Sequence, residues 1–270
     1  MERSVRNIVL AVFVGLSASA FAQSEGGLLL GVEAEKKIDK KLSVSVEAEM
    51  RTRNDFKTMD RWKFGISGSY KFTKWLKADV GYDLLNYNNR EKKEYYTSSS
   101  GKYVKIHWRP GYWGVKHRFH ASLTGSVKIA DFKLSLRERW QYSYRPEKDV
   151  TRWTWRVSDA AGNAVSDTDM RLDDDYARSA KGKNQLRSRL EIEYDKKRAL
   201  FSPYASMELY NSWAIEKIRY TVGTGIRLSK QHSLDVFYRF QNMRNVDADE
   251  YDPDMHYLGI GYKFKFCRCS

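Results

Sequence analysis

Residues 42–51 read Leu-Ser-Val-Ser-Val-Glu-Ala-Glu-Met-Arg, so apolar and polar side chains alternate at every position. A period of two places the two sets on opposite faces of a β-strand, whereas a helix needs a period near 3.6. The same alternation runs through 61–72, 76–84 and 119–129. These stretches are longer than the strands of about five or six residues that are usual in soluble proteins. The pattern therefore predicts long strands with one apolar face.

Extended along the chain, the alternation predicts eleven strands. They cover 28–35, 42–51, 61–72, 76–84, 119–129, 132–144, 184–194, 201–210, 218–228, 234–240 and 257–266. Short connections such as 73–74 and 130–131 alternate with longer polar ones such as 88–112 and 145–183. Short turns opposite long loops, with strands of about 9–11 residues, are typical of outer-membrane barrels. Such barrels normally have an even strand count, so we expect a single antiparallel transmembrane barrel of about twelve strands, with ten as the alternative and a weak extra strand within 103–115.

The first 22 residues have the features of an export signal. Arg3 and Arg6 precede the apolar run 8–16, and 20–22 read Ala-Phe-Ala, which suits a small-x-small cleavage site. We expect a signal peptide at 1–22, a barrel at 23–266 and a short tail at 267–270. The chain has a mean hydropathy of -0.68 and no apolar run of about 18 residues, which excludes a helical membrane protein.

The formal charge of +14 indicates an anionic partner. An exported chain does not meet cytosolic nucleic acid, so we expect outer-membrane lipid and lipopolysaccharide, and a small anionic solute, as partners. The 18 Tyr and 8 Trp suit the aromatic girdles of a barrel in the outer membrane of a Gram-negative cell.

Several segments of the chain resemble the family known as domain of unknown function 2490. They are 28–53, 72–82, 116–120, 134–142, 186–191 and 202–209, so the resemblance extends over nearly all of the chain after residue 22. It implies an outer-membrane barrel without an established activity or defined site residues.

The last predicted strand, 256–266, alternates aromatic residues and ends its pattern at Phe266. It resembles the terminal strand by which barrel-assembly machinery recognises its substrates, here through Tyr262, Phe264 and Phe266. The tail Cys267-Arg268-Cys269-Ser270 departs from this pattern, because such chains are expected to stop at the terminal Phe.

The polar phase of the strands predicts a charged barrel interior. Its lumen-lining candidates are Arg51, Arg118, Arg137, Arg139, Arg187 and Arg189, with Glu47, Glu191 and Glu208 as the acidic ones. Two interpretations are open. Either cross-strand ion pairs fill the lumen of a structural barrel, or the arginines line a narrow pore that prefers anions.

A lipid-acting hydrolase is the alternative function. His120 and Ser122, with Glu138 on the next predicted strand, resemble the His, Ser and Glu set of lipid A deacylase barrels. If 130–131 is a two-residue turn, however, the register sets Leu123 opposite Glu138, so Glu138 faces outward while His120 and Ser122 face the lumen. A triad cannot be divided between two faces of a sheet, and we therefore expect a protein that is not an enzyme.

No residue pattern predicts a metal or a cofactor. Aspartates at 167, 169 and 173–175 lie in the longest predicted loop without the spacing of an EF-hand, so a solvated loop is favoured over a Ca²⁺ site. Trp153 and Trp155 in the same loop suit either stacking on sugar or the membrane interface. Cys267 and Cys269 are too close together for an ordinary disulfide and too few for a zinc site.

A third interpretation is a soluble, basic, exported β-sandwich. In that fold, the apolar faces around Leu42, Trp62 and Leu76 would form an internal core.

Overall fold

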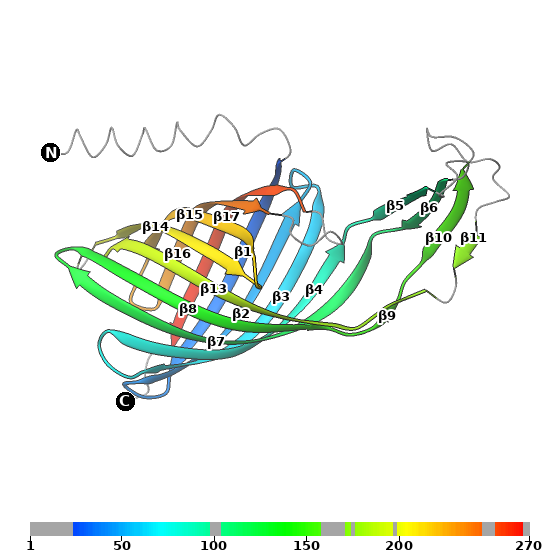
Figure 1. Ribbon diagram of the computed structural model, residues 1–270. Helices are drawn as coiled ribbons and strands as arrows, with labels where there is room; N and C mark the ends of the chain where they lie inside the picture. The colour runs from blue at the N-terminus through cyan, green and yellow to red at the C-terminus, as the bar shows by residue number, and fades with distance from the viewer. Residues whose placement is uncertain are drawn as a thin grey trace.

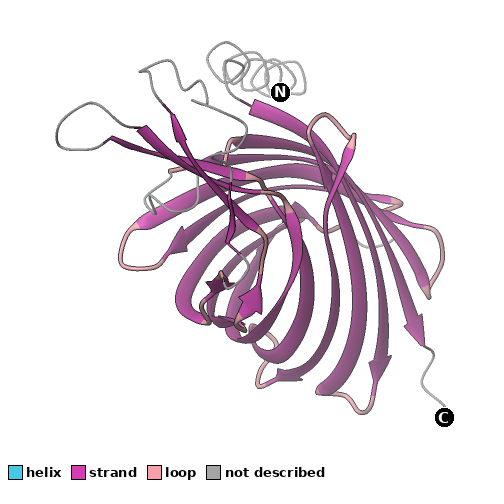
Figure 2. Ribbon diagram, turned by 90° about the vertical axis from the view of Figure 1, so that its right-hand side faces the viewer, coloured by secondary structure: helices cyan, strands magenta, loops and turns pink. Residues whose placement is uncertain are grey.

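The computed structural model describes residues 24–97, 104–157, 171–173, 176–196, 199–244 and 252–266. Strands are the regular secondary structure of these residues (Figures 1 and 2). Among them there is no helix long and apolar enough to cross a membrane. The predicted signal peptide at 1–22, the tail at 267–270, and Asp167, Asp169, Asp174 and Asp175 lie outside the described residues.

Eleven of the described strands close into a barrel. Figure 2 shows the curved wall that they form. In chain order they are β1 (Ser24–Lys37), β2 (Leu42–Arg53), β3 (Thr58–Lys71), β4 (Leu76–Asn89), β7 (Tyr112–Ile129), β8 (Phe132–Arg145), β13 (Lys181–Tyr194), β14 (Phe201–Asn211), β15 (Ile215–Arg227), β16 (His232–Met243) and β17 (Asp254–Phe266). The predicted all-β barrel is confirmed, and each of the eleven predicted segments matches one of its strands, although 61–72 and 218–228 run one residue past the observed ends. The count is one fewer than the expected twelve.

The barrel closes through a parallel pair of strands. β1 pairs with β17 from Ser24 opposite Asp254 to Lys36 opposite Phe266. The other neighbouring barrel strands pair antiparallel. With an odd number of strands that alternate in direction, the first and last run the same way, so only a parallel pair can close the ring. A twelfth strand is therefore unnecessary, and the extra strand expected within 103–115 is β6 (Val104–Arg109), which pairs outside the barrel.

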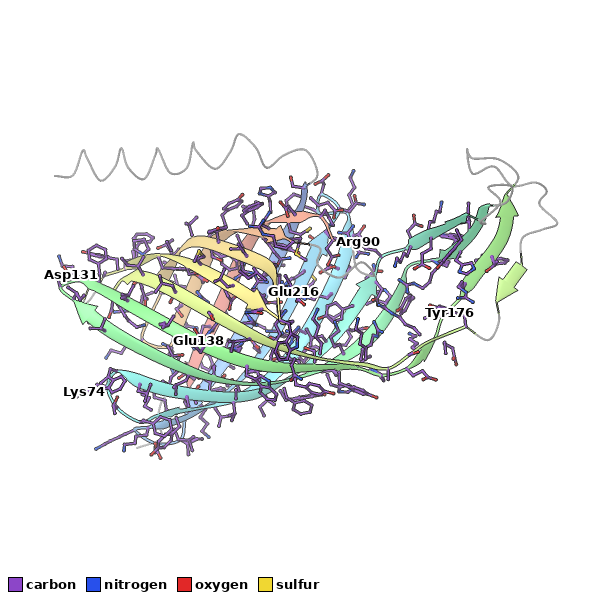
Figure 3. All side chains as sticks on the ribbon, viewed as in Figure 1. Lys74, Arg90, Asp131, Glu138, Tyr176 and Glu216 are labelled. Carbon is purple, nitrogen blue, oxygen red and sulfur yellow. The ribbon has the colours of Figure 1, made fainter. Side chains whose placement is uncertain are left out.

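The connections define two ends of the barrel. At the turn end the strands are joined by 38–41, 72–75, 130–131, 195–200 and 228–231, and at the loop end by 54–57, 90–111, 146–180, 212–214 and 244–253. Lys74 and Asp131 mark the turn end in Figure 3, and Arg90 and Tyr176 mark the loop end. β1 begins at the loop end, whereas β17 finishes at the turn end.

The two longest connections build a second sheet beyond the loop end (Figure 1). It has the order β11-β10-β6-β5, formed by β11 (Arg171–Asp173), β10 (Arg152–Val157), β6 and β5 (Lys92–Thr97), while β9 (Lys148–Asp149) pairs with β12 (Ala177–Arg178). Trp153 lies opposite Trp108 in this sheet. The predicted loop around Trp153 and Trp155 is thus partly strand.

The barrel exposes apolar side chains and buries charged ones, the reverse of the distribution in a soluble protein. Large apolar residues are exposed on the outward face of the barrel, among them Val32, Val46, Phe64, Val80, Phe119, Leu136, Leu190 and Leu258. Buried polar and charged residues include Arg51, Asp83, Gln141, Glu208 and Arg219. A soluble sandwich needs an apolar core, so the sandwich interpretation is wrong.

A small apolar cluster lies inside the barrel beside the parallel seam. Leu29, Phe237, Met255 and Tyr257 are buried together there. A Cβ atom on Gly259 would collide with the ring of Phe237. Glycine at position 259 therefore lets this ring lie flat against the barrel wall.

Candidate functional site

The barrel encloses a charged cavity of about 870 Å³. Its lining includes sixteen Lys or Arg residues but only eight Asp or Glu residues. The sequence-derived candidates Arg51, Arg118, Arg137, Arg139, Arg187, Arg189, Glu47 and Glu208 all line it. Glu191 lines an adjoining cavity of about 760 Å³, which shares Glu47 and Arg189 with the first. The structure thus brings the nine candidate residues together around one lumen.

Glu208 on β14 is the centre of the most buried charge cluster, with 4% of its surface exposed. Its Oε1 accepts hydrogen bonds from Nη2 of Arg137 (2.9 Å) and from Nη2 of Arg187 (2.8 Å). Its Oε2 accepts from Nη1 of Arg219 (3.2 Å) and from the hydroxyl of Tyr210 (2.9 Å). The strand order explains this convergence, because β13 and β15 flank β14 and β8 lies directly beyond β13. A single carboxylate therefore serves three arginines.

Most other acidic side chains of the lumen have a basic partner. The ion pairs are Arg51–Glu49 (2.7 Å), Lys63–Glu47 (2.7 Å), Lys77–Asp79 (2.8 Å), Arg118–Asp83 (3.8 Å), Lys263–Glu33 (2.8 Å), Lys263–Glu35 (2.7 Å) and Arg189–Glu191. Unpaired buried charge is costly, so these pairs lower the free energy of a narrow polar lumen. Four of the seven pairs join neighbouring strands, whereas Arg51–Glu49, Lys77–Asp79 and Arg189–Glu191 each lie within one strand.

Six basic residues of the same cavity lack such a partner among the described residues; two of them, Lys71 and Lys265, are exposed near the turn end. Within the described part of the chain, no carboxylate lies within ion-pair distance of Arg61, Arg139, Lys217 or Arg239. Lys217 Nζ lies 4.3 Å from the centre of the Tyr210 ring instead. Aromatic faces compensate a cation only in part, so the lumen keeps a surplus of positive charge.

The lumen is packed toward the loop end. Leu85 is fully buried, and Tyr210, Tyr257 and Gln241 are nearly so. Inward residues nearer the turn end, such as Glu33, are only half-buried. The cavity therefore reaches toward the turn end and narrows to a layer of packed side chains on the loop side.

The hydrolase set does not assemble. Ser122 Oγ donates a hydrogen bond to Asp79 Oδ2 (3.3 Å), and His120 Nδ1 lies 3.8 Å from Asp83 Oδ2. Both side chains are buried in the lumen. Glu138 points away from them, so no triad forms. Within the described residues, moreover, no group of three or more His, Cys, Asp or Glu side chains is placed to hold a metal ion.

Glu138 lies on the outward face of β8, where Figure 3 labels it. The register sets it opposite Leu123, as the two-residue turn predicted. It accepts a hydrogen bond from Ser188 Oγ (2.7 Å) on β13. Its outward neighbour Trp140 donates to Asn184 Oδ1 (3.2 Å). Polar pairs of this kind satisfy hydrogen-bonding groups on an otherwise apolar face.

Sequence reasoning missed several residues that shape the lumen, namely Leu85, Tyr210, Lys217, Phe237 and Tyr257. All except Lys217 are apolar or aromatic residues at positions that the alternation assigns to the inward, polar face. Their apolar character therefore favoured the opposite, outward direction. Phase counted from Asp235 and Arg239 places Phe237 inward, and phase was therefore the signal that could have found it.

The fold and its interior define a closed β-barrel with a charged lumen and an apolar outer face. The chain belongs to the DUF2490 family, whose members are described as proteins of unknown function; the family model matches residues 26–252. The resemblance inferred from the sequence is thereby confirmed. No curated protein matches the chain. Among solved structures, the CymD monoaromatic hydrocarbon channel is similar with a TM-score of 0.36 and 10% sequence identity, over 80% of this chain and 82% of that chain.

Proposed function

We propose that this chain is an integral outer-membrane β-barrel that is not an enzyme and whose lumen is a narrow passage preferring small anions. The observation that carries the proposal is the lining of the lumen, where sixteen basic residues outnumber eight acidic ones. Rings of Arg and Lys favour anions in channels because they replace part of the hydration of the ion. The packed layer on the loop side limits the passage to small solutes.

The outward face supports a membrane location. Its exposed Val, Leu, Ile and Phe side chains suit lipid, and barrel strands of 11–18 residues are long enough to span the hydrocarbon core. The predicted export signal and the final aromatic strand favour the outer membrane. In this proposal Tyr262, Phe264 and Phe266 are read by barrel-assembly machinery, the turn end faces the periplasm, and the loop end faces the lipopolysaccharide surface.

The test is single-channel recording of the refolded protein in a planar bilayer under a KCl gradient. We expect small, stable conductance steps whose reversal potential shows anion preference. Replacing Arg137, Arg139, Arg187 and Arg189 with Gln is expected to reduce that preference severalfold, because four positive charges leave the lumen.

A matched control keeps the same change in net charge outside the lumen. In it, the exposed residues Lys40, Lys41, Lys57 and Lys74 of the turns and loops are replaced with Gln, and we expect the selectivity of the wild type. A correctly folded barrel that never conducts, or a control that loses selectivity equally, contradicts the proposal. Heat modifiability on gels confirms folding of each variant.

A further inference from the structure

The strongest unassigned feature is a layer of basic side chains across the lumen. We call it the arginine layer: Arg61, Arg137, Arg139, Arg187, Lys217, Arg219 and Arg239 around Glu208. The layer contains seven basic residues and one carboxylate, and all eight residues line the same cavity. The other nearby acids have partners of their own: Glu49 pairs with Arg51, Asp83 with Arg118 and Asp79 with Lys77, and Asp235 accepts a hydrogen bond from Tyr204.

The layer extends across the lumen. Glu208 collects Arg137, Arg187 and Arg219 from three strands. On the opposite wall, Arg61 of β3 lies close enough to Lys217 of β15 for the two like charges to repel each other. Arg139 is repelled in the same way by Arg137 and Arg187.

Buried donor atoms remain free in this layer. Nε of Arg61, Arg137, Arg139, Arg187 and Arg219 is buried, and none has a hydrogen-bond partner in the described part of the chain. A buried donor without an acceptor is destabilising, and so is a buried cation without a counter-charge. Glu208 can compensate only part of this charge, so the layer is incomplete without a further anion.

The chemistry of the donors restricts the anion. Guanidinium groups match oxyanions with two or more oxygens, to which they donate paired hydrogen bonds. A surplus of several positive charges in a low-dielectric lumen favours a divalent anion over a monovalent one. A tetrahedral oxyanion is also small enough to fit in a cavity of about 870 Å³.

We infer that the arginine layer binds a divalent tetrahedral oxyanion, either free phosphate or sulfate or the phosphoryl group of a small solute. Arg61, Arg139, Lys217 and Arg239 are the side chains available to it, because no carboxylate of the described residues forms an ion pair with them. Glu208 holds the other three arginines in place and competes with the ligand for them. The inference rests on the proposed function in taking the lumen as the working part of the protein, and it names the class of solute.

The test is isothermal titration of the refolded full chain in detergent with inorganic phosphate at constant ionic strength. We expect saturable binding, and we expect the double variant Arg139→Gln/Lys217→Gln to bind at least tenfold more weakly. That variant removes two charges that neighbouring cations repel and breaks no ion pair of the described residues, so it is expected to fold. Lys40→Gln/Lys74→Gln is the matched control and retains wild-type affinity. No saturable binding by the wild type, or equal loss in the control, overturns the inference.

Competition separates the possible ligands. Sulfate is expected to displace phosphate, whereas acetate and nitrate at the same ionic strength are not; displacement by acetate as effective as that by sulfate overturns the assignment of a divalent anion. Glycerol phosphate competing as well as phosphate identifies the phosphoryl group of a solute as an acceptable source, and failure to compete restricts the site to the free ion.

Glu208→Gln provides an independent measurement. This variant is expected to unfold at a lower temperature than wild type in chloride, and added phosphate is expected to reduce the difference by supplying the lost negative charge. If phosphate leaves the difference in unfolding temperature unchanged, the arginine layer does not bind the anion, and the inference is overturned. Anion-selective conductance without phosphate binding rejects the inference and keeps the proposed function, while phosphate binding by a barrel that never conducts rejects the passage and keeps the site.

Discussion

At the scale of single residues, the interior is shaped as much by small side chains as by charged ones. Phe237 lies against the barrel wall because Gly259 on β17 and Gly223 on β15 leave room for it. The two glycines flank Phe237 in the register of the sheet. Removing a side chain from both neighbouring strands therefore creates the space for an aromatic ring inside a charged lumen.

Gly259→Ala is expected to destabilise the barrel by about 1–3 kcal/mol, the usual effect of overpacking a filled site. The reason is that the new Cβ must displace the Phe237 ring. The free energy of unfolding in urea, measured in lipid vesicles, checks this. Gly125→Ala is the matched control, because its Cβ would have no atom within 4 Å. Equal effects at the two positions would show that the Phe237 contact is not the cause.

At the scale of elements, β1 is the strand whose placement depends most on side chains. Parallel pairing is slightly less stable per residue than antiparallel pairing. Side-chain ion pairs hold β1 in place near both of its ends. Glu25 accepts hydrogen bonds from Nη1 (2.8 Å) and Nη2 (2.7 Å) of Arg90 at the loop end. Lys263 joins Glu33 and Glu35 near the turn end. Although burial acts against the charged form, the hydrogen bonds and negative charge of Glu25 raise the pKa of Arg90.

The double variant Arg90→Gln/Lys263→Gln is expected to speed amide hydrogen exchange in β1 relative to the β7–β8 hairpin. Partly exposed ion pairs contribute about 0–1 kcal/mol each, so the expected loss of protection is a few-fold. Lys183→Gln is the control, since it removes the ion pair with Glu216, which lies outside both β1 and the β7–β8 hairpin. Exchange that accelerates uniformly over the barrel contradicts a local role for these contacts.

At the scale of the whole molecule, the sequence predicted most of the fold because the alternation of Leu42 to Arg51 reflects two faces of the sheet, an apolar one outside and a polar one toward the lumen. It also predicted the register that turns Glu138 outward. It did not predict the parallel closure, since strand pairing between residues more than 200 positions apart has no local pattern. Contacts that skip a strand, such as Glu208 on β14 with Arg137 on β8, depend on the stagger of several strands, and no single segment encodes that stagger.

The parallel closure predicts where each end of the barrel can be reached. In a Cys267→Ser/Cys269→Ser background, Ser24→Cys and the loop variant Lys57→Cys are both expected to react with a membrane-impermeant maleimide on intact cells. Lys74→Cys, at a turn, is expected to react only after the outer membrane is permeabilised. A Ser24→Cys variant that behaves like Lys74→Cys would place the start of β1 in the periplasm and rule out pairing in parallel with β17.

Because β1 starts at the loop end, this barrel is also a candidate scaffold for displaying inserted epitopes at two different ends. In the proposed orientation, a short epitope inserted just before Ser24 would be presented to the surroundings of the cell, and one inserted at 228–231 would remain in the periplasm. In an even-stranded barrel closed by antiparallel pairing, the first strand begins and the last strand finishes at the same end of the barrel. Here the odd count places the free ends of the first and last strands, β1 and β17, at opposite ends of the barrel.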